Sequence, residues 1–202
     1  KLSDTIQQSA TSSEFLIGDA IVLLNQMLLD LAALHGLAYE NMTRAQGWRF
    51  LDIGRRIERT IYMSSFLTRA LSSSIADTPS ALEAVLEMAD SAITYRSRYN
   101  LMPHIAAVYD LVMLDETNPR SLLFQFRQLT KHLERLPADS SALPSPSHRT
   151  LIEAVTKLRL TDPMVLSTGG SGVAETLEHL EKAMPRLSDE LAVNYFAHSA
   201  IS

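Results

Sequence analysis

Apolar residues recur at three- and four-residue spacing along most of the chain, which is the spacing of one face of an α-helix. The first such segment covers about residues 14–38 and includes Ile17, Ile21, Leu24, Leu28 and Leu31. Polar residues interrupt it at Asn25, Gln26, Asp30 and His35. Because a membrane span would be more uniformly apolar, we interpret this segment as a buried amphipathic helix.

The same pattern predicts helices throughout the remainder of the chain. A second helix is expected to follow His35-Gly36, or the first helix to run on almost unbroken through Leu71. Further helices are expected over 80–100, 104–114, 119–136, 146–160, 172–183 and 187–198. Thr78 and Pro79 have the residue types of an N-cap and a first helical position, and Asn118 and Pro119 repeat that pair. Linkers are expected near 72–79 and 137–147, where Ser and Pro gather.

No convincing alternating strand interrupts these segments, so the sequence predicts an all-α fold. We expect a helical bundle of about six to eight helices, formed by residues 1–202 as one domain. A chain of 202 residues is long enough to bury a substantial core.

Composition removes several classes of function. A net charge of −5 disfavours a general nucleic-acid binder, and the absence of cysteine excludes disulfides and cysteine-ligated metals. No signal segment opens the chain, so a cytoplasmic location without a membrane partner is expected. Because the chain begins with Lys1 instead of Met, we expect it to be part of a longer polypeptide.

The stretch GWRFLDIGRRIERT, residues 47–60, places many charges in a predicted helix beside the single tryptophan. A helical projection gives one apolar face, formed by Phe50, Ile53, Ile57, Ile61, Leu67 and Leu71. A second face carries Asp52, Arg56 and Arg59, and we interpret it as solvated surface. The Asp52–Arg56 pair has i,i+4 spacing and contributes about 0.2–0.5 kcal/mol there.

The third face alternates aromatic and charged residues, namely Arg44, Trp48, Leu51, Arg55, Glu58, Tyr62, Phe66 and Arg69. Burial of its aromatic rings would carry Arg44, Arg55 and Glu58 toward the interior, where each charge requires a partner. Gly54, at the edge of this face, suggests a close helix approach. Two interpretations remain open: an ion-pair network between helices, and a pocket in which arginines bind a carboxylate or phosphate.

Three motifs resemble the bacterial alpha-E family. They are ENMTRAQGWRFLDIGRRIERT (residues 40–60), MLDETNPRSLLFQ (113–125) and NYFAH (194–198). The resemblance covers the chain from about Glu40 to the end. It implies a helical domain that occurs alone or fused to circularly permuted ATP-grasp enzymes, with no established catalytic mechanism of its own.

The resemblance also implies partners and a set of site residues. Expected partners are an ATP-grasp ligase and a transglutaminase-like protease, in a system that makes or modifies peptides. The residues that we assign to a ligand site are Glu40, Arg44, Trp48, Arg55, Glu58, Arg59, Asp115, Asn118 and Arg120. Family members usually begin with a segment rich in Tyr-Trp, Gly-Arg and Glu-Arg, which this sequence lacks.

Other motifs have plainer interpretations. DETNPRS, residues 115–121, is typical of a helix-capping turn, although Arg120 and the first-turn amides could also bind an anion. The Gly-rich stretch at 167–175 lacks the spacing of a phosphate loop and is expected to be a helix entry. The six histidines form no Glu-x-x-His pair, so neither a metal site nor a cofactor is expected.

Three functions therefore remain in view. The first is an accessory domain that binds a carboxylate or phosphate and works with an ATP-grasp ligase in amide-bond formation. The second is an enzyme in which Glu58, in a dry pocket among arginines, acts as general base. The third is a scaffold whose arginines and carboxylates only form ion pairs between helices.

Overall fold

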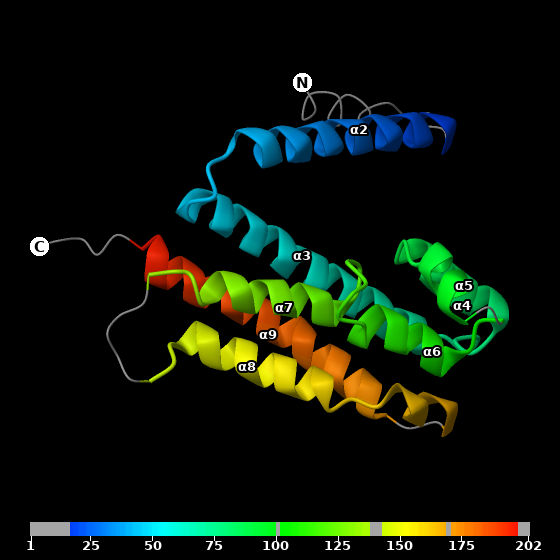
Figure 1. The fold of residues 1–202 in the computed structure, drawn as a ribbon. Helices are drawn as coiled ribbons and strands as arrows, with labels where there is room; N and C mark the ends of the chain where they lie inside the picture. Colours follow the sequence, from blue (N-terminus) through cyan, green and yellow to red (C-terminus); the bar gives the residue numbers. More distant parts are fainter. Residues whose placement is uncertain (1–16, 100–101, 138–142, 169–170, 198–202) are drawn as a thin grey trace, which may run out of the picture. The chain divides into compact units, whose positions relative to one another are not determined.

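The computed structural model describes residues 17–99, 102–137, 143–168 and 171–197, and it divides the chain into two compact units, 1–49 and 50–202. In the described residues it contains eight α-helices, one π-helical turn and one 3₁₀ turn, with no strand (Figure 1). The predicted all-α class is therefore confirmed. Each unit is described by itself below.

The first unit contains α2 (Ile17–Asn41) and the first residues of α3 (Gln46–Leu71). No residue of α2 is buried, and Leu28 and Leu34 are each 64% exposed. The prediction of a buried helix was wrong for the described structure. The apolar residues surround α2 instead of forming one stripe, so no single face is directed toward a core.

By length and composition, α2 could cross a membrane: it has 25 residues, and the mean hydropathy of its most apolar part is 1.6. Buried core helices and signal segments have the same length and composition. This property alone therefore assigns α2 no location.

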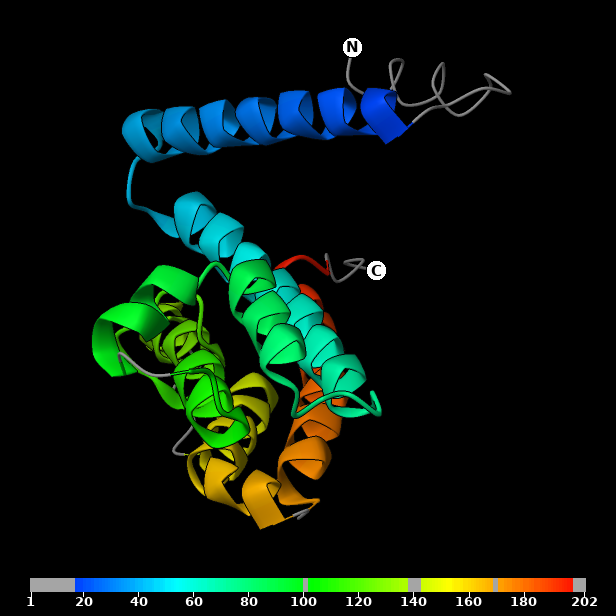
Figure 2. The ribbon, with the colours of Figure 1, turned by 90° about the vertical axis from the view of Figure 1, so that its right-hand side faces the viewer.

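The second unit is a helical bundle built around a continuous apolar core. Besides α3 it contains α4 (Pro79–Met88), α5 (Ala92–Tyr99), α6 (Ile105–Tyr109), η1 (Asp110–Leu114), α7 (Leu122–Leu133), α8 (Pro146–Arg159), η2 (Pro163–Thr168) and α9 (Gly172–Tyr195). α8 contacts both α7 and α9 (Figures 1 and 2). Tyr109 and Phe126 are among the largest fully buried side chains, and the Tyr109 hydroxyl donates to the Leu67 carbonyl at 3.3 Å.

Side-chain caps start α4, α6 and α7, and one of the two predicted caps is confirmed. Thr78 caps α4 by accepting from the Ala81 amide, with Pro79 at the first helical position. His104 caps α6 in the same way, accepting from the Ala107 amide. At α7 the predicted cap was wrong: Ser121 accepts from the Phe124 amide at 3.1 Å, and the helix begins after it instead of after Asn118.

Two further predictions about helix boundaries were wrong. The helix expected over 80–100 is divided into α4 and α5 by Asp90, whose φ of 47° is the left-handed conformation that ends helices. Conversely, the two helices expected on either side of Pro185 form one helix, α9. Met184 and Leu187 flank this proline and are fully buried, so core packing holds both halves of α9 in line.

Candidate functional site

A buried ionic cluster of the second unit centres on Asp52, on α3. Its side chain is only 3% exposed, and its carboxylate accepts hydrogen bonds from Arg55 and Arg56, three and four residues later on the same helix. The Arg56 Nε–Asp52 Oδ2 distance is 2.7 Å. Asp52 therefore lies in the interior, and the interpretation of its face as solvated surface was wrong. The predicted Asp52–Arg56 pair itself is confirmed.

Helix α7 completes the cluster. The Asp52 Oδ2 atom lies 2.7 Å from His132 Nε2, and Arg56 Nη1 donates to Gln125 Oε1 at 3.0 Å. Gln125 in turn donates to the Pro119 carbonyl at 2.6 Å. The network thus links α3 to α7 and to the segment that precedes α7. It uses Asp52 and Arg56, whereas the pairing between helices was expected for Arg44, Arg55 and Glu58.

The charge state of Asp52 follows from these contacts. Burial alone would raise the pKa of the carboxyl group, but hydrogen bonds from Arg55, Arg56 and His132 outweigh it and lower the pKa from 3.8 to about 2. Because Asp52 is then ionised near neutral pH, it accepts the hydrogen bond and His132 Nε2 carries the proton. The shift corresponds to roughly 2 kcal/mol in favour of the ionised folded state.

Positive charge exceeds negative charge beside this network. Partial burial and the neighbouring guanidinium groups of Arg55, Arg120 and Arg56 lower the pKa of Arg59, and the Asp52 carboxylate acts in the opposite direction. Arg59 is exposed, and its side chain has no hydrogen bond or ion pair with the described residues. We call Arg55, Arg56, Arg59 and Arg120 the arginine cluster. An anion that bound Arg59 would relieve the repulsion within it.

The turn before α7 places Arg120 in the arginine cluster. Asp115 accepts from the Thr117 and Asn118 amides at 2.7 and 3.1 Å, and the Asn118 Oδ1 atom accepts from the Arg120 amide at 3.1 Å. The Arg120 guanidinium pairs with Asp90. Asp115 and Asn118 therefore have the structural role that was predicted for a capping turn, and they hold the backbone from which Arg120 extends.

The remaining predicted residues divide between the two units. In the first unit, Glu40 is exposed, and the Arg44 guanidinium lies 4.2 Å from the centre of the Tyr39 ring and 4.6 Å from that of Trp48. Arg44 also donates to the Tyr39 carbonyl at 2.7 Å. Arg44 and Trp48 thus form a local cation–π group within that unit.

In the second unit, the face predicted to be buried is largely exposed. Glu58 is exposed, and Tyr62 is 58% exposed. The dry pocket expected around Glu58 is therefore not formed. The side of α3 that packs against the core is the neighbouring one, which carries Ile53, Ile57 and Leu67. Gly54 has no atom within 4 Å of the position of an added Cβ, so the close helix approach expected there was also wrong.

Sequence reasoning missed Gln125 and His132. Their partners on α3 lie 69 and 80 residues away in the chain, and no local spacing connects them. The i,i+4 pair of Asp52 and Arg56 was the available signal. Within the described residues, no group of three or more His, Asp or Glu side chains could hold a metal ion.

The sequence of the chain matches one protein family. Residues 3–196 match the Alpha-E family, described as a predicted alpha-helical domain with a conserved ER motif. This chain contains the Glu-Arg dipeptide at Glu58-Arg59 and at Glu134-Arg135. The first of them supplies Arg59 of the arginine cluster.

Similar proteins occur in mycobacteria. Uncharacterised proteins of Mycobacterium bovis and of Mycobacterium tuberculosis strain H37Rv are each 32% identical over 179 residues, which is 85% of this chain. The chain spans 20% of the length of these relatives. No solved structure matches the chain.

Proposed function

The chain belongs to the Alpha-E family, and we propose that it is a binding domain that takes a carboxylate or phosphate group at the arginine cluster. In this proposal it works with an ATP-grasp ligase in peptide or amide-bond biosynthesis. The observation that carries the binding site is the exposed Arg59 side chain beside Arg55, Arg56 and Arg120. Its partial burial first, and then the charges of these three arginines, lower its pKa. A bound anion supplies the opposite charge that this position lacks.

The division of labour within the cluster follows from the contacts. Arg55 and Arg56 already donate to Asp52, which fixes their guanidinium groups. Arg59 and Arg120 are both exposed, but Arg120 pairs with Asp90, which leaves Arg59 as the donor that a ligand would meet. Arginine suits this role because its planar fork can donate two parallel hydrogen bonds to one carboxylate or phosphate.

Anion binding is tested on the full chain with inorganic phosphate. At constant ionic strength, replacing chloride by phosphate should raise the melting temperature, because a ligand at ten times its Kd adds about 1.4 kcal/mol to the free energy of unfolding. Arg59→Gln should abolish the rise. Arg69→Gln, an exposed arginine of the same helix outside the cluster, should retain it. An equal rise in wild type and Arg59→Gln would refute the site.

The scaffold is the second candidate, and the Asp52 network favours it. That network is satisfied by contacts between α3 and α7 and requires no ligand. A scaffold predicts no difference between phosphate and chloride in any variant. It also predicts that Arg59→Gln leaves every property of the chain unchanged.

The partner is tested separately, by size-exclusion chromatography with an ATP-grasp ligase from the same genome, with and without ATP. Co-elution that is lost in Arg59→Glu and kept in Arg69→Glu would support an assembly that uses the arginine cluster. Separate elution of wild type and ligase would refute this part of the proposal and leave the anion site standing. A transglutaminase-like protease is the second partner to assay in the same way.

A further inference from the structure

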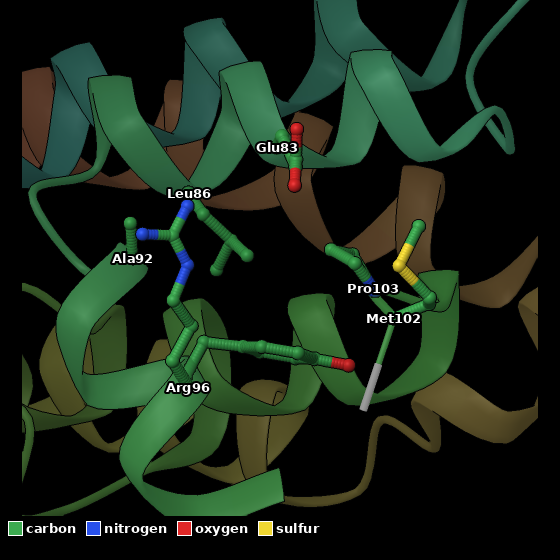
Figure 3. A pocket seen from close by; sticks show the side chains of 7 residues that line it. Glu83, Leu86, Ala92, Arg96, Met102 and Pro103 are labelled. Atoms are coloured by element: carbon green, nitrogen blue, oxygen red, sulfur yellow. The ribbon is translucent and has the colours of Figure 1, made fainter. Parts of the chain in front are cut away.

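A small pocket lies between α4 and α5, apart from the arginine cluster. Its volume is about 130 Å³, and its lining includes Glu83 and Leu86 of α4 and Tyr95 and Arg96 of α5. Figure 3 shows Arg96 extending from α5 toward α4, with its guanidinium beside Leu86 and Ala92. Glu83 lies on α4 above the opposite part of the pocket, which Met102 and Pro103 border (Figure 3).

The two charges of this pocket are opposite in sign and do not neutralise each other. With the described residues, neither the Glu83 nor the Arg96 side chain forms a hydrogen bond or ion pair. They come from different helices, and both border the same cavity. A ligand that carried both an ammonium and a carboxylate group could pair with both side chains at once.

The floor between the charges is apolar and fixed. Leu86 is 2% exposed and Tyr95 is fully buried. The Tyr95 ring stacks on Tyr99 at 4.8 Å between ring centres, and its hydroxyl accepts from the His104 amide at 3.3 Å. Because these contacts hold the ring in place, the floor is formed before any ligand arrives.

The size of the pocket limits the ligand to a small molecule. A cavity of about 150 Å³ holds benzene, which has six heavy atoms. A cavity of 130 Å³ that opens to solvent therefore suits a molecule of similar size whose charged ends project toward the opening. Drug-sized ligands and nucleotides require several times this volume.

We propose that this pocket binds a small amino acid with an apolar side chain. Glu83 accepts hydrogen bonds from the ammonium group, and Arg96 donates to the carboxylate. Leu86, Tyr95 and Met102 contact the side chain. The proposal does not depend on the anion site, because the two sites share no residue.

The test is a titration of the full ¹⁵N-labelled chain followed by NMR, with L-valine as the probe. Two controls each remove one charge: isobutylamine lacks the carboxylate, and isovalerate lacks the ammonium group. Valine should shift the amide signals of α4 and α5 with a roughly millimolar Kd, and each control should bind at least tenfold more weakly. Equal binding of all three compounds, or no shift with valine, would overturn the proposal.

Variants locate the site. Arg96→Gln and Glu83→Gln should each weaken valine binding at least tenfold, and Glu87→Gln, an exposed glutamate of α4 outside the pocket, should leave it unchanged. Both targets are exposed, so the fold should be retained. Arg59→Gln should also bind valine normally, which separates this result from failure of the anion site. Undiminished binding by Arg96→Gln would show that valine binds elsewhere.

Discussion

Helices α2 and α9 have nearly the same length, 25 and 24 residues, but their apolar residues are distributed differently. In α9 the buried residues recur every three or four positions and form one stripe: Val173, Thr176, Leu177, Leu180, Ala183, Met184, Leu187 and Leu191. In α2 the apolar residues lie on all sides of the helix, and none of them is buried. An apolar stripe identifies the face of a helix that packs against the core. A helix that is apolar on all sides indicates only that it tends to leave water, without identifying the face that packs.

The largest expected difference comes from one substitution made in both helices. Leu177→Ala in α9 should lower the free energy of unfolding by about 2–5 kcal/mol, since Leu177 is fully buried and its loss leaves a cavity. Leu28→Ala in α2 should change it by about 0.5 kcal/mol or less. Chemical denaturation of the full chain measures both. If Leu28→Ala cost as much as Leu177→Ala, α2 would be covered in solution and the contrast would fail.

A smaller effect on the free energy of unfolding is expected from two aspartates, Asp52 in the second unit and Asp30 in the first. The pKa of Asp52 is lower in the folded chain, so its stabilising contribution is present above pH 3.8 and is lost as the pH falls through about 2. The stability advantage of wild type over Asp52→Asn should therefore shrink by roughly 2 kcal/mol between pH 5 and 2. Denaturation curves of both proteins across this range measure it.

Asp30 of α2 provides the matched control for Asp52. It accepts one hydrogen bond, from the Gln26 amide at 2.9 Å, at an exposed site on one helix. Asp30→Asn should therefore change stability little at any pH. A constant difference between wild type and Asp52→Asn from pH 5 to 2 would contradict the buried network.

The smallest effect is expected from replacing a helical glycine by alanine in each unit, which lowers the backbone entropy of the unfolded chain. Gly54→Ala in α3 should stabilise the second unit by about 0.5–1 kcal/mol, because the added Cβ meets no atom within 4 Å and alanine favours the helix. Gly36→Ala in α2 has equal space. It should raise helix content, measured by circular dichroism, without shifting the main unfolding transition. Destabilisation by Gly54→Ala would indicate an unrecognised contact at that position.

Local sequence signals accounted for much of the fold. Apolar spacing predicted the all-α class, and Thr78 followed by Pro79 located the start of α4. The errors occurred where tertiary contacts decide between local options. Asp90 adopts a left-handed conformation, which its residue type does not require. Ser121 replaces Asn118 as the cap of α7, and the Asn118 side chain is engaged elsewhere: its Nδ2 donates to Ser91 Oγ and the Leu111 carbonyl, and its Oδ1 accepts from the Arg120 amide.

The candidate site was only partly predictable for a similar reason. The projection of α3 assigned Arg55 and Arg59 to different faces, and it placed the buried charge on the wrong one, because Asp52 is buried and Glu58 is exposed. Whether Asp52 is buried depends on His132 and Gln125, which α7 brings to it from a distant part of the chain. Periodicity identifies the faces of a helix, but it does not identify which charged face has a partner.

Pro185 interrupts the backbone hydrogen bonds of α9, although α9 is one continuous helix. Because proline has no amide hydrogen, the Glu181 carbonyl lacks its usual partner, and the hydrogen-bonded ladder is interrupted in mid-helix. Local opening can therefore begin within α9 as well as at its ends. In amide hydrogen exchange we therefore expect α9 to behave as two shorter helices that share one hydrophobic stripe, each with its own rate of exchange with solvent.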